Sequence, residues 1–222
     1  MNPREFVEKL GAVNFLDTFN PYGNRCPVHD INDAPSKRSQ TLRAILEAAA
    51  RTEIDALWIG RDLGYRGGRR TGLALTDDAH IDAHTRRWGI LAERTTKGAA
   101  VSERTAKVIW RVLSQIDASI FLWNVFPFHP HEPGNPFSNR AHNTHERNAG
   151  EDILSELVLI LKPKRLIAIG NDAARTAYRV ARTEVAFQVR HPSYGGQSEF
   201  VSGIQRLYAT SESDHGHNVK FA

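Results

Sequence analysis

Three polar side chains that could carry out hydrolysis follow three separate apolar segments of the chain: Asp62, Asn124 and His191. A carboxylate can orient water or stabilise a cation, and an imidazole can stabilise negative charge that develops on a leaving group. A carboxamide carries a donor and an acceptor side by side, which suits it to reading the edge of a base. No serine, cysteine or threonine lies in a G-x-S-x-G turn, so the set favours attack by water over attack by a side-chain nucleophile.

Short apolar segments alternate with helical patterns along the chain, and these elements must position the polar side chains. The expected strands lie at about 56–60, 119–125, 165–169 and 184–189. The expected helices lie at about 3–19, 39–51, 103–115, 142–161, 172–181 and 198–208, with one or two short helices within 78–97. This alternation predicts an α/β fold, a three-layer αβα sandwich around a mostly parallel four-stranded sheet. Because ligands bind such sheets at the carboxyl ends of the strands, we expect the three polar side chains to meet there.

The segment from Gly60 to Thr76, after the first predicted strand, is rich in glycine and arginine. Glycine lets a backbone approach a ligand closely, and the guanidinium of arginine suits phosphate. The segment contains neither G-x-x-x-x-G-K-[ST] nor G-x-G-x-x-G, so it is not a nucleotide-binding phosphate loop. We therefore expect this loop to hold catalytic groups beside a polyanion, with Arg66, Arg69 and Arg70 facing phosphate.

Length and composition set broader limits. The 222 residues, of which 41% are hydrophobic, suit one α/β domain over 1–222, with a helical and irregular extension at about 1–40 and a loose tail at about 210–222. The formal net charge of +4 is compatible with nucleic acid without being diagnostic of it. Cys26 is the single cysteine, which leaves no internal disulfide or cysteine-ligated cluster. No transmembrane segment or signal peptide is recognised, so we expect a cytoplasmic protein that does not bind membranes.

A metal site receives little support from the sequence. Four histidines lie close together, and Cys26-x-x-His29 has the spacing of a ligand pair, but no familiar ligand pattern is complete. The four are His129, His131, His142 and His145. We expect no metal and no cofactor, and we place these histidines on loop and helix surfaces, where they would face phosphate.

Each polar residue also has an ordinary structural explanation when it is taken alone. Asp62 could form an Asx turn, Asn124 could cap a strand end, and His191 before a proline could be a surface histidine. The arginines after Gly60 could form a solvated face, and Asn171-Asp172 is best explained as a helix cap. The first three explanations weaken together, because all three residues are expected at one edge of the sheet.

The same residues resemble the motifs of the uracil-DNA glycosylase superfamily. Gly60-Arg-Asp-Leu-Gly64 resembles the first motif, which reads GQDPYH in one branch, and His191-Pro192-Ser193 matches the second motif, HPS. The resemblance spans about residues 54–208. It implies that Asp62 positions the attacking water and supports the oxocarbenium ion. It further implies that Asn124 reads uracil and that His191 bonds to uracil O2.

The chain departs from the family pattern at several positions, which resembles an atypical branch without an iron-sulfur cluster. Leu63 replaces a proline, and Gly64 stands where the GQDPYH branch has the tyrosine that blocks the thymine methyl. Leu75 lies where a phenylalanine commonly stacks on the base, so Tyr65 or Phe126 is a candidate for stacking instead. The start of the wedge loop is also unusual, and the candidates for filling the vacated base stack are Tyr194 and Gln197.

The function that the resemblance implies is removal of uracil from single- or double-stranded DNA by a monomeric enzyme. The resemblance implies that Arg66, Arg69, Arg70 and Arg190 hold phosphates and that Ser193 helps to pinch the backbone. Two other functions remain open. One is binding of uracil-containing or abasic DNA without turnover, and the other is hydrolysis of small nucleosides or nucleotides.

Overall fold

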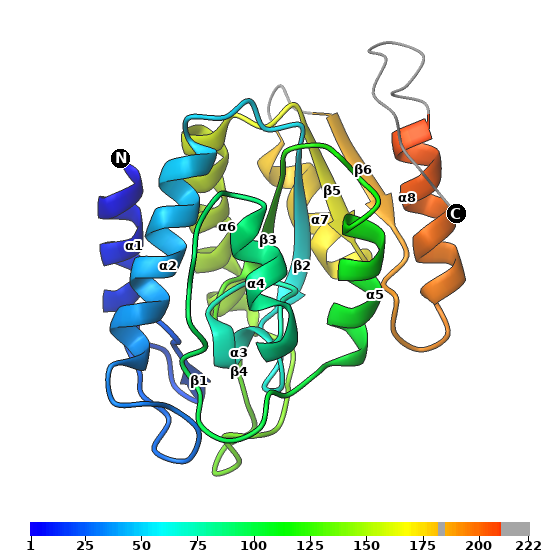
Figure 1. Cartoon of the computed structure of the whole chain (residues 1–222). Coiled ribbons are helices and arrows are strands. Elements are labelled where there is room, and N and C mark those ends of the chain that lie inside the picture. The colour runs from blue at the N-terminus through cyan, green and yellow to red at the C-terminus, as the bar shows by residue number, and fades with distance from the viewer. Residues whose placement is uncertain (182–184, 210–222) are drawn as a thin grey trace.

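The structure is a computed structural model that describes residues 1–181 and 185–209. Its central sheet contains β2 (Ala56–Asp62), β3 (Ile120–Phe126), β5 (Arg165–Ile169) and β6 (Val185–Val189). These strands are parallel and lie in the order β3-β2-β5-β6 (Figure 1). The fold prediction is therefore confirmed, with strand boundaries within two residues of those expected.

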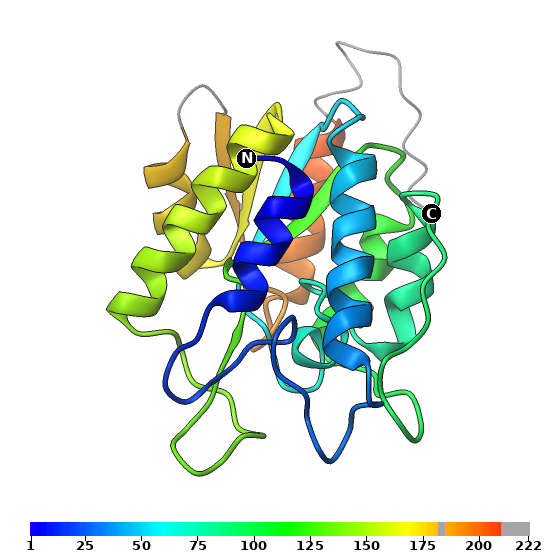
Figure 2. The same cartoon turned by 90° about the vertical axis from the view of Figure 1, so that its left-hand side faces the viewer.

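Helices cover both faces of the sheet, as the sequence predicts. The long helices are α1 (Pro3–Ala12), α2 (Ala34–Ala49), α5 (Arg104–Leu113), α6 (Thr144–Leu161), α7 (Asn171–Val180) and α8 (Gln197–Ala209). One apolar cluster joins α1, α2, α6 and α7 to the sheet, and Figure 2 shows α1, α2 and α6 on this side. A second cluster joins α5 and α8 to the opposite face. Alternate residues of β2 and β5 enter the two clusters, as the period of two requires.

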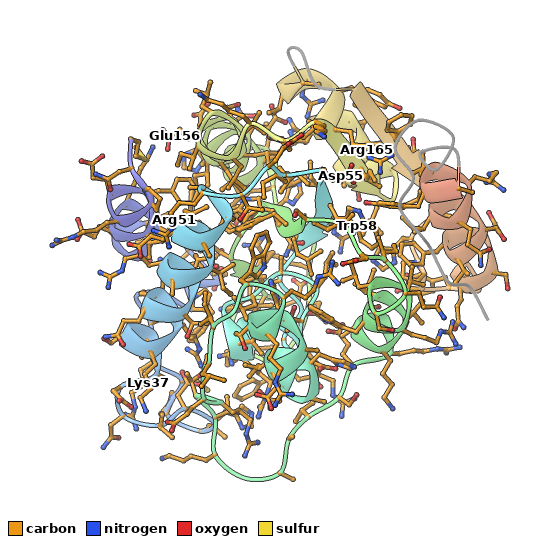
Figure 3. All side chains as sticks on the ribbon, turned by 45° about the horizontal axis from the view of Figure 1, so that its top comes forward. Lys37, Arg51, Asp55, Trp58, Glu156 and Arg165 are labelled. Carbon is orange, nitrogen blue, oxygen red and sulfur yellow. The ribbon has the colours of Figure 1, made fainter. Side chains whose placement is uncertain are left out.

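Strand β2 shows this alternation clearly. Leu57 and Ile59 belong to the first cluster, whereas Trp58 belongs to the second. The indole N–H of Trp58 donates to the hydroxyl of Tyr208 on α8 at 3.1 Å, which satisfies a buried polar group. At the amino end of the sheet Arg165 pairs with Asp55 at 2.9 Å (Figure 3). Burial on both faces thus fixes the sheet on which the polar edge is built.

Several short elements complete the fold. They are β1 (Thr18–Phe19), α3 (Gly68–Thr71), the 3-10 turn η1 (Asp78–His80), α4 (Ile81–Arg86) and β4 (His129–Pro130). Those labelled β1, α3 and β4 lie near the lower, carboxyl end of the sheet in Figure 1. β1 pairs antiparallel with β4, so the region expected as a long loop at 126–140 is tied to the N-terminal region. In the described ranges 1–181 and 185–209, no helix has the length and apolar character needed to cross a membrane.

The N-terminal region differs from the expected helix at 3–19. Helix α1 ends at Ala12, because the side-chain amide of Asn20 donates to the carbonyls of Leu10 and Val13 at 2.7 and 2.9 Å and so replaces the helical bonds. Phe6 and Leu10 of α1 lie in the core beside α2. The residues expected as an extension therefore contribute to the main core, and the tail at 210–222 lies outside the described residues.

Buried ion pairs hold the loops at this edge. Arg38 of α2 pairs with Asp30, and its Nε donates to the carbonyl of Arg70 at 2.9 Å. Arg70 in turn pairs with Asp78 at 2.8 Å, and both side chains are buried. Breaking one partner of such a pair leaves an uncompensated charge in the interior, which is strongly destabilising. The arginines of this region consequently fix the loop that follows β2.

Burial also lowers the pKa of a histidine in the same region. His84 of α4 contacts the hydroxyl of Thr76 through Nδ1 at 2.8 Å and packs against Trp110. Burial, with a smaller contribution from Arg87, lowers the pKa of His84 to about 3. The folded protein therefore keeps this imidazole neutral at pH values at which an exposed histidine is charged.

We predict that the free energy of unfolding falls as pH falls from about 6.5 toward 3, because the unfolded chain binds a proton that folded His84 refuses. His84→Gln should reduce this slope by up to about 1.4 kcal/mol per pH unit. Denaturant titrations at several pH values measure the slope, and His145→Gln on an exposed helix surface is the control. Equal slopes for wild type and His84→Gln would contradict the assignment.

Candidate active site

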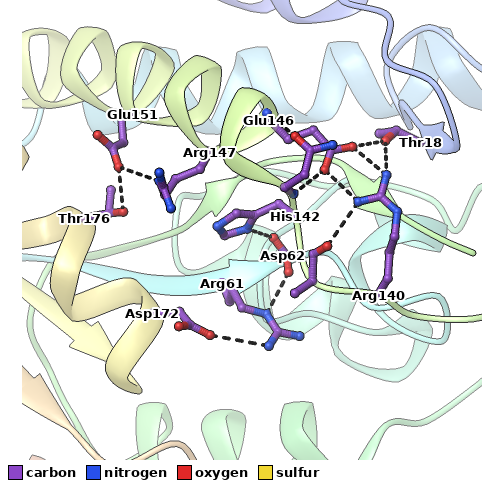
Figure 4. Close-up of polar contacts among 12 residues, drawn as sticks. Thr18, Arg61, Asp62, Arg140, His142, Glu146, Arg147, Glu151, Asp172 and Thr176 are labelled. Carbon is purple, nitrogen blue, oxygen red and sulfur yellow. Dashed lines mark hydrogen bonds and ion pairs between the residues drawn. The ribbon is translucent and has the colours of Figure 1, made fainter.

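Asp62 ends strand β2 and is the acidic centre of the carboxyl edge. Its side chain is only 6% exposed, and both of its carboxylate oxygens have partners. Nδ1 of His142 bonds to Oδ1, and Nε of Arg61 donates to Oδ2 at 2.7 Å (Figure 4). Arg61 continues to Asp172 of α7, with 3.5 Å between Nη1 and Oδ2. Asp62 therefore lies between a histidine and an arginine in a site that is largely withdrawn from water.

His142 reaches Asp62 from the segment before α6, and its position depends on how that helix begins. Asn143 caps α6, and its side chain and that of Glu146 form a reciprocal capping box. Arg140 binds both oxygens of Glu146 at 2.6 and 2.7 Å, and Thr18 of β1 donates to the same carboxylate at 2.8 Å. Figure 4 shows this cluster beside the Asp62–His142 contact. The helix start is thus fixed on both sides of His142.

Asn124 lies beside Asp62 on the neighbouring strand. The register of the sheet places Gly60 opposite Asn124 and Asp62 opposite Phe126. Asn124 is 1% exposed, and its Oδ1 is buried without a hydrogen-bond partner in the part of the chain that the structure describes. An unpaired acceptor of this kind costs about 1–3 kcal/mol, which a ligand that supplies a donor would recover. The carboxamide is therefore prepared for a ligand with a hydrogen-bond donor.

Gly60 and Leu75 form the surroundings of this carboxamide. A Cβ atom at position 60 would collide with Asn124 Oδ1 and lie 3.0 Å from Leu75 Cδ2, so only glycine fits between them. Leu75 has φ of 55°, a left-handed conformation that is uncommon for leucine. Its carbonyl accepts a hydrogen bond from Trp110 Nε1 at 3.2 Å, which helps to hold the conformation. The structure thus places Leu75 next to Asn124.

His191 follows β6 and has a defined tautomer. Its Nδ1 accepts the backbone N–H of Ser193 at 3.1 Å and lies 2.7 Å from the hydroxyl of the same residue. Because Nδ1 accepts a backbone hydrogen, the ring proton of the neutral imidazole lies on Nε2. Burial lowers the pKa of His191, and the nearby charges of Arg61 and Arg190 lower it further. A neutral imidazole that donates through Nε2 is the result.

The predicted phosphate-binding arginines fall into two groups. Arg66 and Arg190 are exposed, and both remain candidates for contact with a polyanion. Arg69 and Arg70 are 3% and 5% exposed, so the prediction that they face phosphate is wrong. Arg69 stacks over Phe19 with 4.0 Å between its guanidinium carbon and the ring centre, and Arg70 pairs with Asp78. Their role is to fix the loop from inside.

The candidates for stacking on the base and for filling the vacated base stack also differ in exposure. Phe126 is fully buried and packs edge-on against Phe128 with ring centres 5.2 Å apart, so the prediction that it stacks on a base is corrected. Tyr65 is partly buried, and its backbone N–H donates to Asn139 at 3.0 Å. Tyr194 is 99% exposed with φ of 51°, and Gln197 begins α8 just beyond it. Tyr65, Tyr194 and Gln197 stay candidates.

Sequence reasoning missed three residues that the structure brings to this edge. Arg61 and His142 contact Asp62, and the position of Arg61 within the first motif was the available signal. The sequence predicts a surface position for His142, since nothing in the sequence shows its distance from Asp62. Glu103, before α5, lies against the loop so that a Cβ at Gly64 would come within 3.2 Å of its carboxylate. Burial raises the pKa of Glu103, as does the neighbouring Asp77.

No three histidine, cysteine, aspartate or glutamate side chains within 1–181 and 185–209 are grouped so that they could hold a metal ion. The buried His129 instead bonds through Nε2 to the carbonyl of Ser138 at 2.8 Å. The histidines that are close in the sequence are thus distributed between loop structure and the Asp62 contact.

The fold and its polar edge define a class of protein, an α/β domain that presents a carboxylate, a carboxamide and an imidazole at the carboxyl edge of one parallel sheet. A family model described as the Uracil DNA glycosylase superfamily matches residues 49–205. The match covers more than half of the chain, and the protein belongs to this superfamily. The resemblance seen in the motifs is therefore confirmed.

Comparison with solved structures shows a protein with a similar fold. Wild-type SMUG2 of Pedobacter heparinus is similar with a TM-score of 0.65, and the similarity covers 96% of this chain and 100% of that chain. The sequence identity is 11%, so this likeness concerns the fold. No curated protein sequence matches the chain.

We predict that Gly60→Ala destabilises the protein by about 1–3 kcal/mol, because the added methyl group overlaps Asn124 Oδ1 and crowds Leu75. Gly11→Ala in helix α1 is the matched control, since the added methyl group would lie 3.6 Å from the carbonyl oxygen of Tyr22, an ordinary contact distance. Denaturant unfolding measures both variants. A Gly60→Ala protein as stable as Gly11→Ala would show that the Asn124 side chain is not held in place.

Proposed function

We propose that this protein is a monofunctional DNA glycosylase that hydrolyses the N-glycosidic bond of uracil in DNA and leaves an abasic site. The observation that carries the proposal is Oδ1 of buried Asn124, which has no hydrogen-bond partner among the described residues and lies beside Gly60 and Leu75 at the carboxyl edge. Uracil offers a donor at N3 and an acceptor at O4, which complement a carboxamide. Cytosine has no N3 hydrogen, and a mismatch at such a contact is worth roughly 1–3 kcal/mol.

The reaction begins when the target nucleotide leaves the base stack, at a cost of a few kcal/mol. Exposed Tyr194 is suited to fill the vacated stack, and it lies in the turn between β6 and α8 with Ser193 before it and Gln197 at the start of α8. Arg66 and Arg190 supply exposed positive charge for the phosphates. Tyr65 and Leu75 form the proposed walls for the flipped base. DNA is thus the proposed partner.

Bond cleavage then uses His191 at the leaving base and Asp62 at the sugar. As the bond between C1′ and N1 breaks, negative charge spreads to uracil O2, and neutral His191 donates its Nε2–H to that oxygen. The lowered pKa of His191 suits a hydrogen-bond donor that keeps its proton rather than a strong acid. The Asp62 carboxylate supports the positive charge that develops on the sugar and helps to hold the attacking water. Arg61, paired with Asp62, adds a positive charge between the two groups.

The decisive experiment is release of uracil from single- and double-stranded oligonucleotides, detected by alkaline cleavage of the abasic product. We predict release by wild type and a loss of about 10²–10⁴-fold in single-turnover rate for Asp62→Asn, with DNA binding retained. Asp82→Asn, a change of an exposed aspartate on α4, is the control. An unchanged rate in Asp62→Asn would remove Asp62 from the mechanism.

The same assay separates the two rival functions. Binding of uracil-containing DNA without base release at high protein concentration would favour a binding protein. Release of uracil from free deoxyuridine at a rate equal to that from DNA would favour a nucleoside hydrolase.

A salt titration tests the division between exposed and buried arginines. We predict that Arg66→Ala reduces the magnitude of the slope of log K, where K is the association constant for DNA, against log salt concentration by about 1, because one phosphate contact is lost. Arg70→Ala should leave the slope unchanged and lower the free energy of unfolding by about 3–5 kcal/mol, because Asp78 loses its buried partner. A change of slope in folded Arg70→Ala, or none in Arg66→Ala, would reverse the assignment.

A further inference from the structure

We infer that His142 is a catalytic residue that accepts the proton of the attacking water, with Asp62 orienting its ring. The inference rests on the proposed function and assigns to a histidine outside both motifs a step that Asp62 alone would otherwise perform. It starts from the contact between His142 Nδ1 and Asp62 Oδ1, in which both side chains are nearly buried, at 8% and 6% exposed.

The contact fixes the tautomer of His142. A carboxylate is an acceptor only, so the hydrogen in this bond belongs to Nδ1. In the neutral imidazole Nε2 then carries a lone pair. No described residue forms a hydrogen bond with Nε2, and the atom is not among the buried polar atoms without a partner, so it remains open to a small molecule such as water. His142 is therefore oriented as a base.

Asp62 is less suited to the same step. Its Oδ1 is bonded to His142 and its Oδ2 to Arg61, so a water on this carboxylate would share oxygens that already accept strong hydrogen bonds. Nε2 of His142, by contrast, carries no such bond in the part of the chain that the structure describes, and neutral imidazole is the side chain that most often acts as a general base. A carboxylate that holds a histidine by Nδ1 stabilises the imidazolium formed at Nε2, as in hydrolases with a histidine base.

The surroundings of His142 add few competing charges. Asp62 on β2 is its direct partner, and Arg61 lies behind that carboxylate, where it is paired with Asp172 of α7. From β3 the neighbour is the uncharged ring of Phe126, 6.1 Å between ring centres. On its own segment, Arg140 and Glu146 neutralise each other. The charge that faces the ring is thus the carboxylate of Asp62.

The step balances without a further reactant. The water oxygen forms a bond to C1′ as the bond from C1′ to N1 breaks, and the electron pair of that bond leaves with uracil. The water proton moves to Nε2 of His142, which becomes an imidazolium paired with Asp62. The departing uracil anion is held by His191 Nε2–H. His142 returns its proton to solvent when the base and the abasic DNA leave.

The test compares single-turnover uracil release at saturating protein between about pH 5 and pH 8, where histidine changes charge. His142→Asn places an amide N–H near the position of Nδ1, so it can still bond to Asp62, but it has no basic nitrogen. We expect the wild-type rate to be lower at pH 5 than at pH 8. We expect His142→Asn and His142→Ala both to lose about 10²–10⁴-fold and to lose this dependence on pH.

His145→Asn, on the exposed first turn of α6, is the control and should keep the wild-type rate and profile. A folded His142→Asn protein within about threefold of wild type, or with the wild-type pH profile, would reduce His142 to a positioning residue and overturn the inference while leaving the proposed function intact. A wild-type protein that releases no uracil from DNA at any pH would overturn the proposed function and this inference with it.

Discussion

Parallel pairing of β2 with β3 is the constraint on which the site depends. Their register sets Gly60 opposite Asn124 and Asp62 opposite Phe126, so the carboxylate and the carboxamide leave neighbouring strands two residues apart. The missing side chain at Gly60 leaves the space that Asn124 Oδ1 and Leu75 occupy. Because both faces of the sheet are buried, a slip of one residue would exchange every core side chain between the two apolar clusters. Core packing thereby fixes the spacing of polar groups that take no part in the core.

Arginines near this edge are of two kinds, exposed and buried in ion pairs, and the sequence does not distinguish them. The loop after β2 contains Arg66, which is exposed, and Arg70, which is buried against Asp78. Both belong to the same arginine-rich run, and only the three-dimensional path of the loop shows which one finds a carboxylate. Arg38 and Asp30 extend the buried set from α2, since Arg38 also binds the carbonyl of Arg70. A basic loop beside a polyanion can thus owe its shape to arginines that the polyanion never touches.

The sequence predicted the elements that depend on local pattern and missed contacts that depend on tertiary structure. Alternating apolar strands and amphipathic helices gave the sheet and its layers, and the polar strand ends located Asp62, Asn124 and His191 at one edge. The helix expected at 3–19 ends at Ala12, because the side chain of Asn20 bonds to carbonyls at the end of α1. The local sequence pattern does not show this contact. The sequence predicts a surface position for His142, because 80 residues separate it from Asp62 and no periodicity links the two.

The two histidines of the site are held in opposite tautomers, and their local partners set this difference. Ser193 donates its backbone N–H to Nδ1 of His191, so that ring donates through Nε2. Asp62 accepts from Nδ1 of His142, so that ring accepts through Nε2. The proposed hydrolysis of a glycosidic bond needs a hydrogen-bond donor at the leaving base and an acceptor at the water, and two tautomers of one side-chain type can supply both. In the proposed reaction the same type of side chain would serve both ends of the bond, because His191 is followed by Ser193, which donates to its Nδ1, whereas His142 bonds to the carboxylate of Asp62.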